Sequence, residues 1–163
     1  MRRLIRHPIA ALAIAGLLTA CTPEGDPMPI DGRTVEVPSG PIDVAEGDPR
    51  HAPLLAVMHA AFAEDLEQPV LLDVQRLRER SGWAFAEVYP RTPTGQQIDY
   101  LRTRYEDERR SGILEDDAAF ILLRYDNGVW RVRELSLNIP GNAWDTWARE
   151  HGAPPEIFHL AGG

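Results

Sequence analysis

The chain has 163 residues, one cysteine, 17 basic and 25 acidic residues, and a formal net charge of −8. This length suits one domain of ordinary size, and a single cysteine excludes an intrachain disulfide framework. The excess of acidic residues argues against a nucleic-acid partner, because binding to phosphates requires a basic surface.

Residues 1–20 have the pattern of an export signal. Three arginines, at positions 2, 3 and 6, precede an apolar run from Ile9 to Leu18. The run is much shorter than the roughly 20 residues that a membrane-spanning helix needs. A basic start, a short apolar stretch and small residues at its end are typical of a signal peptide. Removal of this segment leaves 14 basic and 25 acidic residues, a formal net charge of −11.

The segment Leu18-Thr19-Ala20-Cys21 resembles the lipobox of bacterial lipoproteins. The resemblance implies that Cys21 carries fatty acyl chains and becomes the mature N-terminus, so that lipid anchors the protein in the bacterial cell envelope. Several chains hold a protein stably, because each buried methylene adds about 0.8 kcal/mol. In this family an aspartate after the cysteine typically retains a protein in the inner membrane. Thr22 therefore implies the outer membrane, on its periplasmic side. The alternative is an incidental cysteine behind an ordinary signal peptide.

Residues 21–47 are rich in proline and glycine, and this composition predicts a tether. Such a segment cannot bury enough apolar surface to offset the entropy that it loses on ordering. We expect a semi-extended spacer between the anchor and the folded domain. The stretch "RTVEV" at 33–37 alternates like a strand, and a docked edge strand is the alternative there.

Residues 48–163 predict a single domain that starts with a helix and a hairpin. The helix begins near Asp48-Pro49 or at Pro53, because aspartate before proline suits a helix start, and it ends by Pro69. Strands at 70–80 and 83–90 follow, separated by the turn residues Ser81-Gly82.

A second hairpin is predicted near the C-terminus. Its strands, at 118–125 and 129–137, flank Asp126-Asn127-Gly128, in which Asn and Gly accept positive φ angles easily. In the last strand Trp130 and Val132 share one face, and Arg131 and Arg133 share the other. We therefore expect one face of the sheet to be exposed to solvent.

Two further helices and one short strand are predicted around this hairpin. Thr103 and Glu106 have the spacing of a capping box, which indicates a helix at 104–111 that ends at Gly112. Residues 96–100 suit a short edge strand before it. The last helix is capped by Asn142 and ends at Gly152.

This order of elements predicts an α+β fold: an N-terminal helix packed on a four-stranded antiparallel sheet of two hairpins, with a short helix and a C-terminal helix. The outline resembles the cystatin-like or NTF2-like group. The stretches "GWAF", "IDY", "VWRVRELSL" and "AWDTWAREHGAPPEIF" also resemble a set of uncharacterised bacterial envelope proteins, over residues 70–158. That resemblance implies membership of the set and no particular chemistry.

Motifs for metal, nucleophilic or phosphate chemistry are absent from the sequence. Histidines 51 and 59 lie eight apart, as do histidines 151 and 159, and neither spacing is diagnostic of a metal site. No serine lies in a G-x-S-x-G elbow. We therefore expect no catalytic residue of these types, no metal and no cofactor.

Two groups of residues are candidates for binding or catalysis. Alternating arginines on the first and last long strands would form one basic strip if those strands were neighbours, and the strip would bind a carboxylate-bearing ligand. The alternative is cross-strand pairing with glutamates. The second group would line an NTF2-like pocket, with an aspartate as base and tyrosines as oxyanion donors. The arginines are Arg76, Arg78, Arg80, Arg131 and Arg133, and the pocket residues are Asp99, Tyr100 and Tyr105.

These observations favour a non-enzymatic binding or scaffolding lipoprotein that recognises an envelope protein or polymer. A small enzyme with an acid-base pocket and a structural envelope factor are the alternatives.

The anchor can be tested by the Cys21→Ala variant. We expect it to leave the membrane fraction, because without the thiol no acyl chains can be attached. Cell fractionation measures this release, and mass spectrometry of the native protein should show an acylated N-terminal cysteine. Retention of the variant in the membrane pellet would contradict lipidation.

Overall fold

The computed structural model describes residues 39–138 and 143–159. These residues belong to one compact unit. The signal segment, Cys21 and the stretch at 33–37 lie outside the described residues, as does Asn142. Within the described ranges, no helix is both long and apolar enough to cross a membrane.

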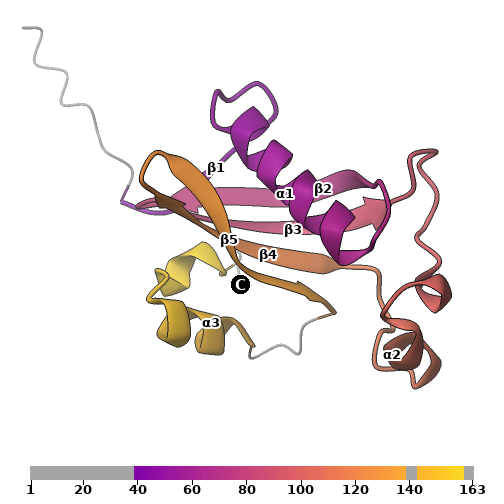
Figure 1. The fold of residues 1–163 in the computed structure, drawn as a ribbon. Coiled ribbons are helices and arrows are strands. Elements are labelled where there is room, and N and C mark those ends of the chain that lie inside the picture. Colours follow the sequence, from indigo (N-terminus) through magenta and orange to yellow (C-terminus); the bar gives the residue numbers. More distant parts are fainter. Residues whose placement is uncertain (1–38, 139–142, 160–163) are drawn as a thin grey trace, which may run out of the picture. The chain divides into compact units, whose positions relative to one another are not determined.

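The domain is built on one antiparallel sheet whose strands follow each other in sequence order (Figure 1). The sheet has five strands, one more than the four predicted. The additional strand β1 lies within the range expected to be tether, and it pairs with the end of β2 at Arg78 and Glu79. Val44 follows β1 into the core and is 4% exposed. The strands are β1 (Ile42–Asp43), β2 (Leu71–Arg80), β3 (Trp83–Arg91), β4 (Ala119–Asp126) and β5 (Val129–Leu137).

Both predicted hairpins are confirmed. Two-residue turns connect β2 to β3 and β4 to β5. The turn residues have positive φ angles: 52° and 75° at Ser81 and Gly82, and 51° and 85° at Asn127 and Gly128. Such turns match the right-handed twist of the flanking strands, so they set the register of each hairpin.

Helix α1 (His51–Asp65) covers one face of the sheet, as predicted. Leu54, Met58 and Phe62 are fully buried against residues of all four long strands. Asp48 lies before the helix, where its carboxylate accepts the amide of Arg50 at 2.8 Å. The helix ends earlier than Pro69, because the chain turns at Glu67, whose φ angle is 52°.

Part of the other face of the sheet is also covered, so the expectation of a solvent-exposed face holds only for the uncovered part, where Asp73 and Arg131 are exposed. Helix α3 (Ala143–His151) and the 3-10 helix η2 (Pro155–Ile157) pack on it (Figure 1). Phe85 of β3 and Leu122 of β4 contact this layer, which contains Trp147 and Ile157. The polar alternation of Arg131 and Arg133 belongs to the edge strand β5. The central strands are apolar on both faces.

The segment between β3 and β4 is less regular than predicted. Residues 96–100 form only a single bridge, between Arg91 and Gln97. A 3-10 helix η1 (Tyr100–Arg102) and helix α2 (Glu106–Arg110) follow. The capping box does not form, because the Thr103 hydroxyl accepts the amide of Tyr105 at 3.2 Å, so the helix starts late.

The covered second face can be tested with Phe85→Ala. Phe85 is 1% exposed and packs edge-on against Trp144 and Phe158, both with ring centroids 5.1 Å away. We expect a loss of about 3–5 kcal/mol in the free energy of unfolding, measured by denaturant titration. Leu71→Ala, at a side chain 47% exposed, should change it by less than about 0.5 kcal/mol. Equal effects would contradict this packing.

Candidate functional site

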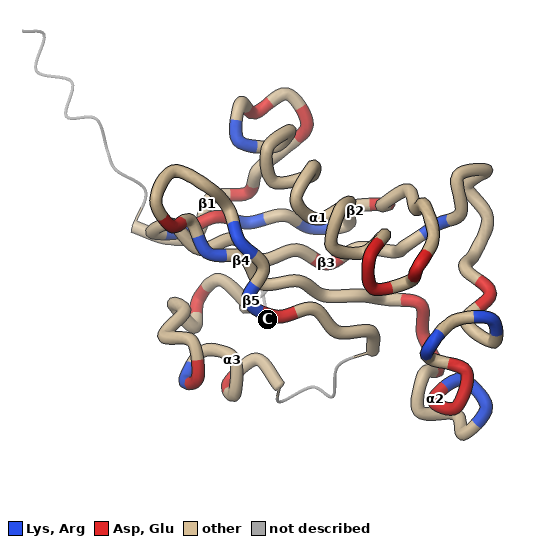
Figure 2. Tube along the Cα trace, viewed as in Figure 1, with Lys and Arg blue, Asp and Glu red and all other residues tan. Residues whose placement is uncertain are grey.

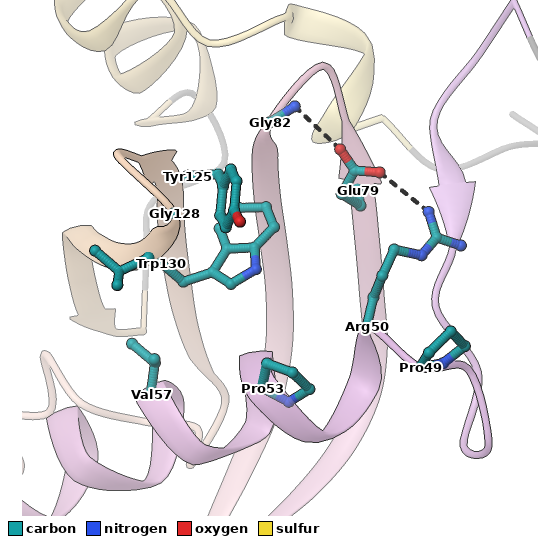
Figure 3. A pocket seen from close by; sticks show the side chains of 10 residues that line it. Pro49, Arg50, Pro53, Val57, Glu79, Gly82, Tyr125, Gly128 and Trp130 are labelled. Carbon is teal, nitrogen blue, oxygen red and sulfur yellow. Dashed lines mark hydrogen bonds and ion pairs between the residues drawn. The ribbon is translucent and has the colours of Figure 1, made fainter.

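A groove of about 690 Å³ lies between the start of α1 and the β4–β5 hairpin. Its walls are mostly apolar, with a short polar rim. Figure 3 shows Pro53 and Val57 of α1 on one side and the rings of Tyr125 and Trp130 on the other. The groove is lined by Pro49, Arg50, Pro53, Val57, Glu79, Gly82, Tyr125, Gly128, Val129 and Trp130.

The hairpin gives this groove an exposed aromatic and aliphatic wall. The Tyr125 and Trp130 rings lie 5.2 Å apart at 55°, and they come from paired positions of β4 and β5. Tyr125 and Val129 are each 47% exposed, although both are large apolar side chains. A β-hairpin held by a tight turn thus presents apolar surface at the mouth of the groove.

Arg50 provides the polar rim. Its guanidinium bonds to the carboxylate of Asp48 at 2.6 Å and to that of Glu79 at 3.1 Å. Glu79 also accepts the amide of Gly82 at 3.0 Å, as Figure 3 shows. The hydrogen bonds from Arg50 lower the pKa of Asp48 to about 2. Asp48 therefore stays ionised at neutral pH, and the rim of one guanidinium and two carboxylates has a formal net charge of −1.

The five candidate arginines do not form one strip. Strand β2 lies near one edge of the sheet and β5 at the other, with β3 and β4 between them. The required condition, that the two strands are neighbours, is therefore not met. Figure 2 shows the basic positions dispersed among acidic ones.

Most of these arginines form ion pairs or hydrogen bonds with nearby groups. Arg76 pairs with Glu87 across the β2–β3 ladder at 3.3 Å, which is the alternative that the sequence left open. Arg78, only 6% exposed, bonds to Asp43 at 2.9 Å and to the carbonyl of His159. Arg133 pairs with Asp126. Arg80 is half-buried and Arg131 is exposed.

The three candidate pocket residues lie in the η1–α2 segment, away from the groove. The Asp99 side chain is 58% exposed and pairs with Arg102 at 3.2 Å, so it is not desolvated as a general base would be. Tyr100 is 2% exposed, and Tyr105 lies edge-on to it, with ring centroids 6.5 Å apart. The structure brings the two tyrosines together and leaves the aspartate outside.

Both tyrosines are held in their neutral form. Burial raises the pKa of Tyr100, and the nearby Asp117 raises it further. Burial also raises the pKa of Tyr105 to about 12, helped by a hydrogen bond that its hydroxyl donates to Asp65 at 2.7 Å. These groups do not exchange protons near neutral pH, so the geometry gives them a structural role.

A buried carboxylate that sequence reasoning missed lies beside this pair. Asp117 is 7% exposed, and its oxygens lie 4.0 Å from Arg91 and 3.8 Å from Arg109. In the sequence it appears as the end of an acidic run, Glu115-Asp116-Asp117, which suggests only solvated charge. No local signal separates the buried member of such a run from its exposed neighbours.

A second unpredicted cluster joins α3 to β5. Glu134, Glu150 and His151 each place a potential ligand atom within 4.8 Å of the others. His151 and Glu134 are hydrogen-bonded at 2.7 Å. The histidine spacing in the sequence could not indicate this cluster, because its partner Glu134 is 17 residues away on another element.

Comparisons with protein-family models, with curated proteins and with solved structures found no match to this chain. The class of protein is therefore described by its fold and its site alone. It is an α+β domain with a five-stranded antiparallel sheet, helices on both faces and an open apolar groove beside one helix.

The neutral state of Tyr105 can be tested by alkaline titration. Its pKa is raised from 10.0 to about 12, so the folded state holds a proton that the unfolded state releases earlier. This contribution to stability is full below about pH 10 and is lost as the pH rises towards 12. We expect Tyr105→Phe to remove the phenolate absorbance step near pH 12. A step that persists in this variant would contradict the assignment.

Proposed function

We propose that this chain is a lipid-anchored periplasmic lipoprotein whose domain is a non-enzymatic binding module. We further propose that its groove binds an extended apolar segment of a partner protein. The lipobox and the signal pattern support the anchor. The observation that carries the binding role is the apolar groove beside α1, with the exposed Tyr125 and Val129 at its mouth.

The form of the groove favours a peptide over a small molecule. Small-molecule sites usually enclose most of the ligand surface. This groove is open to solvent and not an enclosed cavity, so a bound chain could extend beyond it. Extended proline-rich segments, for example, dock in grooves lined by aromatic side chains.

The residue types at the mouth match those that dominate protein interfaces. Tyrosine and tryptophan are enriched among the residues that carry most of the binding energy. Tyr125 and Trp130 present paired rings, and Pro49 and Pro53 present rigid walls opposite them. Because Arg50 is already bonded to both Asp48 and Glu79, apolar contact should supply most of the affinity.

The order of one strand, one helix and four further antiparallel strands is the observation behind the cystatin-like or NTF2-like outline, which stays a prediction from the sequence. We give this outline no functional weight, because one fold serves many functions. The acid-base alternative has less support, since Asp99 is exposed and ion-paired and the tyrosines are held neutral by burial.

The binding surface can be tested by photo-crosslinking in cells, with a crosslinkable phenylalanine analogue at position 125. We expect a defined protein adduct. Val129→Glu should reduce the adduct at least tenfold, because it places a charge in the apolar mouth. Leu71→Glu is the matched control: Leu71 is equally exposed, at 47%, but lies on β2 and does not line the groove.

An adduct that survives Val129→Glu unchanged would contradict this surface. Loss of the adduct in both variants would also contradict it, because the effect would then not be specific to the groove. Circular dichroism of each variant confirms that the fold is retained.

A further inference from the structure

We propose that Glu134, Glu150 and His151 form a zinc site between β5 and the end of α3. The site is independent of the proposed function. It lies on the α3 face of the sheet, whereas the groove lies on the α1 side.

The three side chains converge from two elements. Glu150 and His151 are the last two residues of α3, and Glu134 lies in β5 opposite Leu122, which packs in the α3 layer. Two carboxylate oxygens and one imidazole nitrogen lie within 4.8 Å of one another. In a tetrahedral zinc site, with bonds of 2.0–2.2 Å, ligand atoms lie about 3.3–3.5 Å apart. Metal binding therefore requires only small adjustments of these side chains.

The contact between His151 and Glu134 already brings two of the three ligand atoms together. Nε2 of His151 and Oε1 of Glu134 lie 2.7 Å apart, so they need to separate by about 0.6 Å to coordinate one ion. Their side chains are 22% and 35% exposed, which leaves them room to move. Glu150 is exposed and has no ion-pair partner in the described part of the chain, so its carboxylate is available.

A cavity of about 460 Å³ gives the site access to solvent. Glu150 and His151 line it together with Trp83, Arg124 and Arg133. Arg124 and Arg133 both pair with Asp126 in the same cavity, which leaves one net positive charge there. The two carboxylates of the cluster, Glu134 and Glu150, outweigh this charge, so the cluster and the arginine group together are negative and attract a cation.

The donor set selects zinc over calcium or magnesium. Imidazole nitrogen with carboxylate oxygen suits zinc and its neighbours among the transition metals, whereas calcium and magnesium prefer oxygen ligands alone. Three protein ligands leave the fourth position of a tetrahedral ion open towards the cavity, for water or a further ligand. The bound ion would tie α3 to the sheet and stabilise the layer that covers its second face.

The test uses the full chain with Cys21→Ser, so that the only thiol cannot bind the probe. Zinc affinity is measured by competition with a chromophoric chelator, and cobalt serves as a spectroscopic probe of coordination. We expect one zinc per chain, a thermal midpoint that rises with zinc concentration, and no competition from calcium or magnesium. Glu150→Gln and His151→Ala should each weaken zinc binding at least about 10- to 100-fold.

The matched controls are Glu156→Gln and His159→Ala, which change the same residue types at exposed positions of the same C-terminal region. They should leave the affinity unchanged. Glu150 is exposed, so Glu150→Gln should fold normally, and circular dichroism checks this. Zinc affinity that is unchanged in either site variant, or no zinc binding by the parent chain, would overturn the proposal.

Discussion

The structure depends on burial of both faces of the central strands β3 and β4. Phe85 and Leu122 point to the α3 side, while Ala84, Ala86 and Ile121 point to the α1 side, and all are at most 1% exposed. A strand that is apolar on both faces needs a covering layer on each. Helix α1 supplies one layer, and α3 with η2 supplies the other. This constraint makes the C-terminal segment an integral part of the domain.

The same arrangement determines where function can reside. With both faces of the central strands covered, the open surfaces include the edges of the sheet, the hairpin ends and the seams between helices and sheet. The apolar groove lies at one such seam, between α1 and the β4–β5 hairpin. The Glu134, Glu150 and His151 cluster lies at another, between β5 and α3. Each combines residues from segments distant in the sequence.

The arginines illustrate how the sheet order changes the meaning of a sequence pattern. Arg76, Arg78 and Arg80 do alternate on one side of β2, as a two-residue period requires. The separation of β2 from β5 by two strands prevents a common strip, and Arg76 pairs instead with Glu87 on its neighbour. Alternation in a strand is a local property, whereas adjacency of strands is a property of the whole sheet.

The sequence by itself determined the long strands, both tight turns and the first and last helices, because two-residue and 3.6-residue periods and positive-φ turn residues act locally. It also carries the only support for the anchor at Cys21. Tertiary structure decided the fifth strand, the covering of the second face, the burial of Asp117 and the meeting of His151 with Glu134. These depend on which distant segments pack together, and no local pattern encodes that choice.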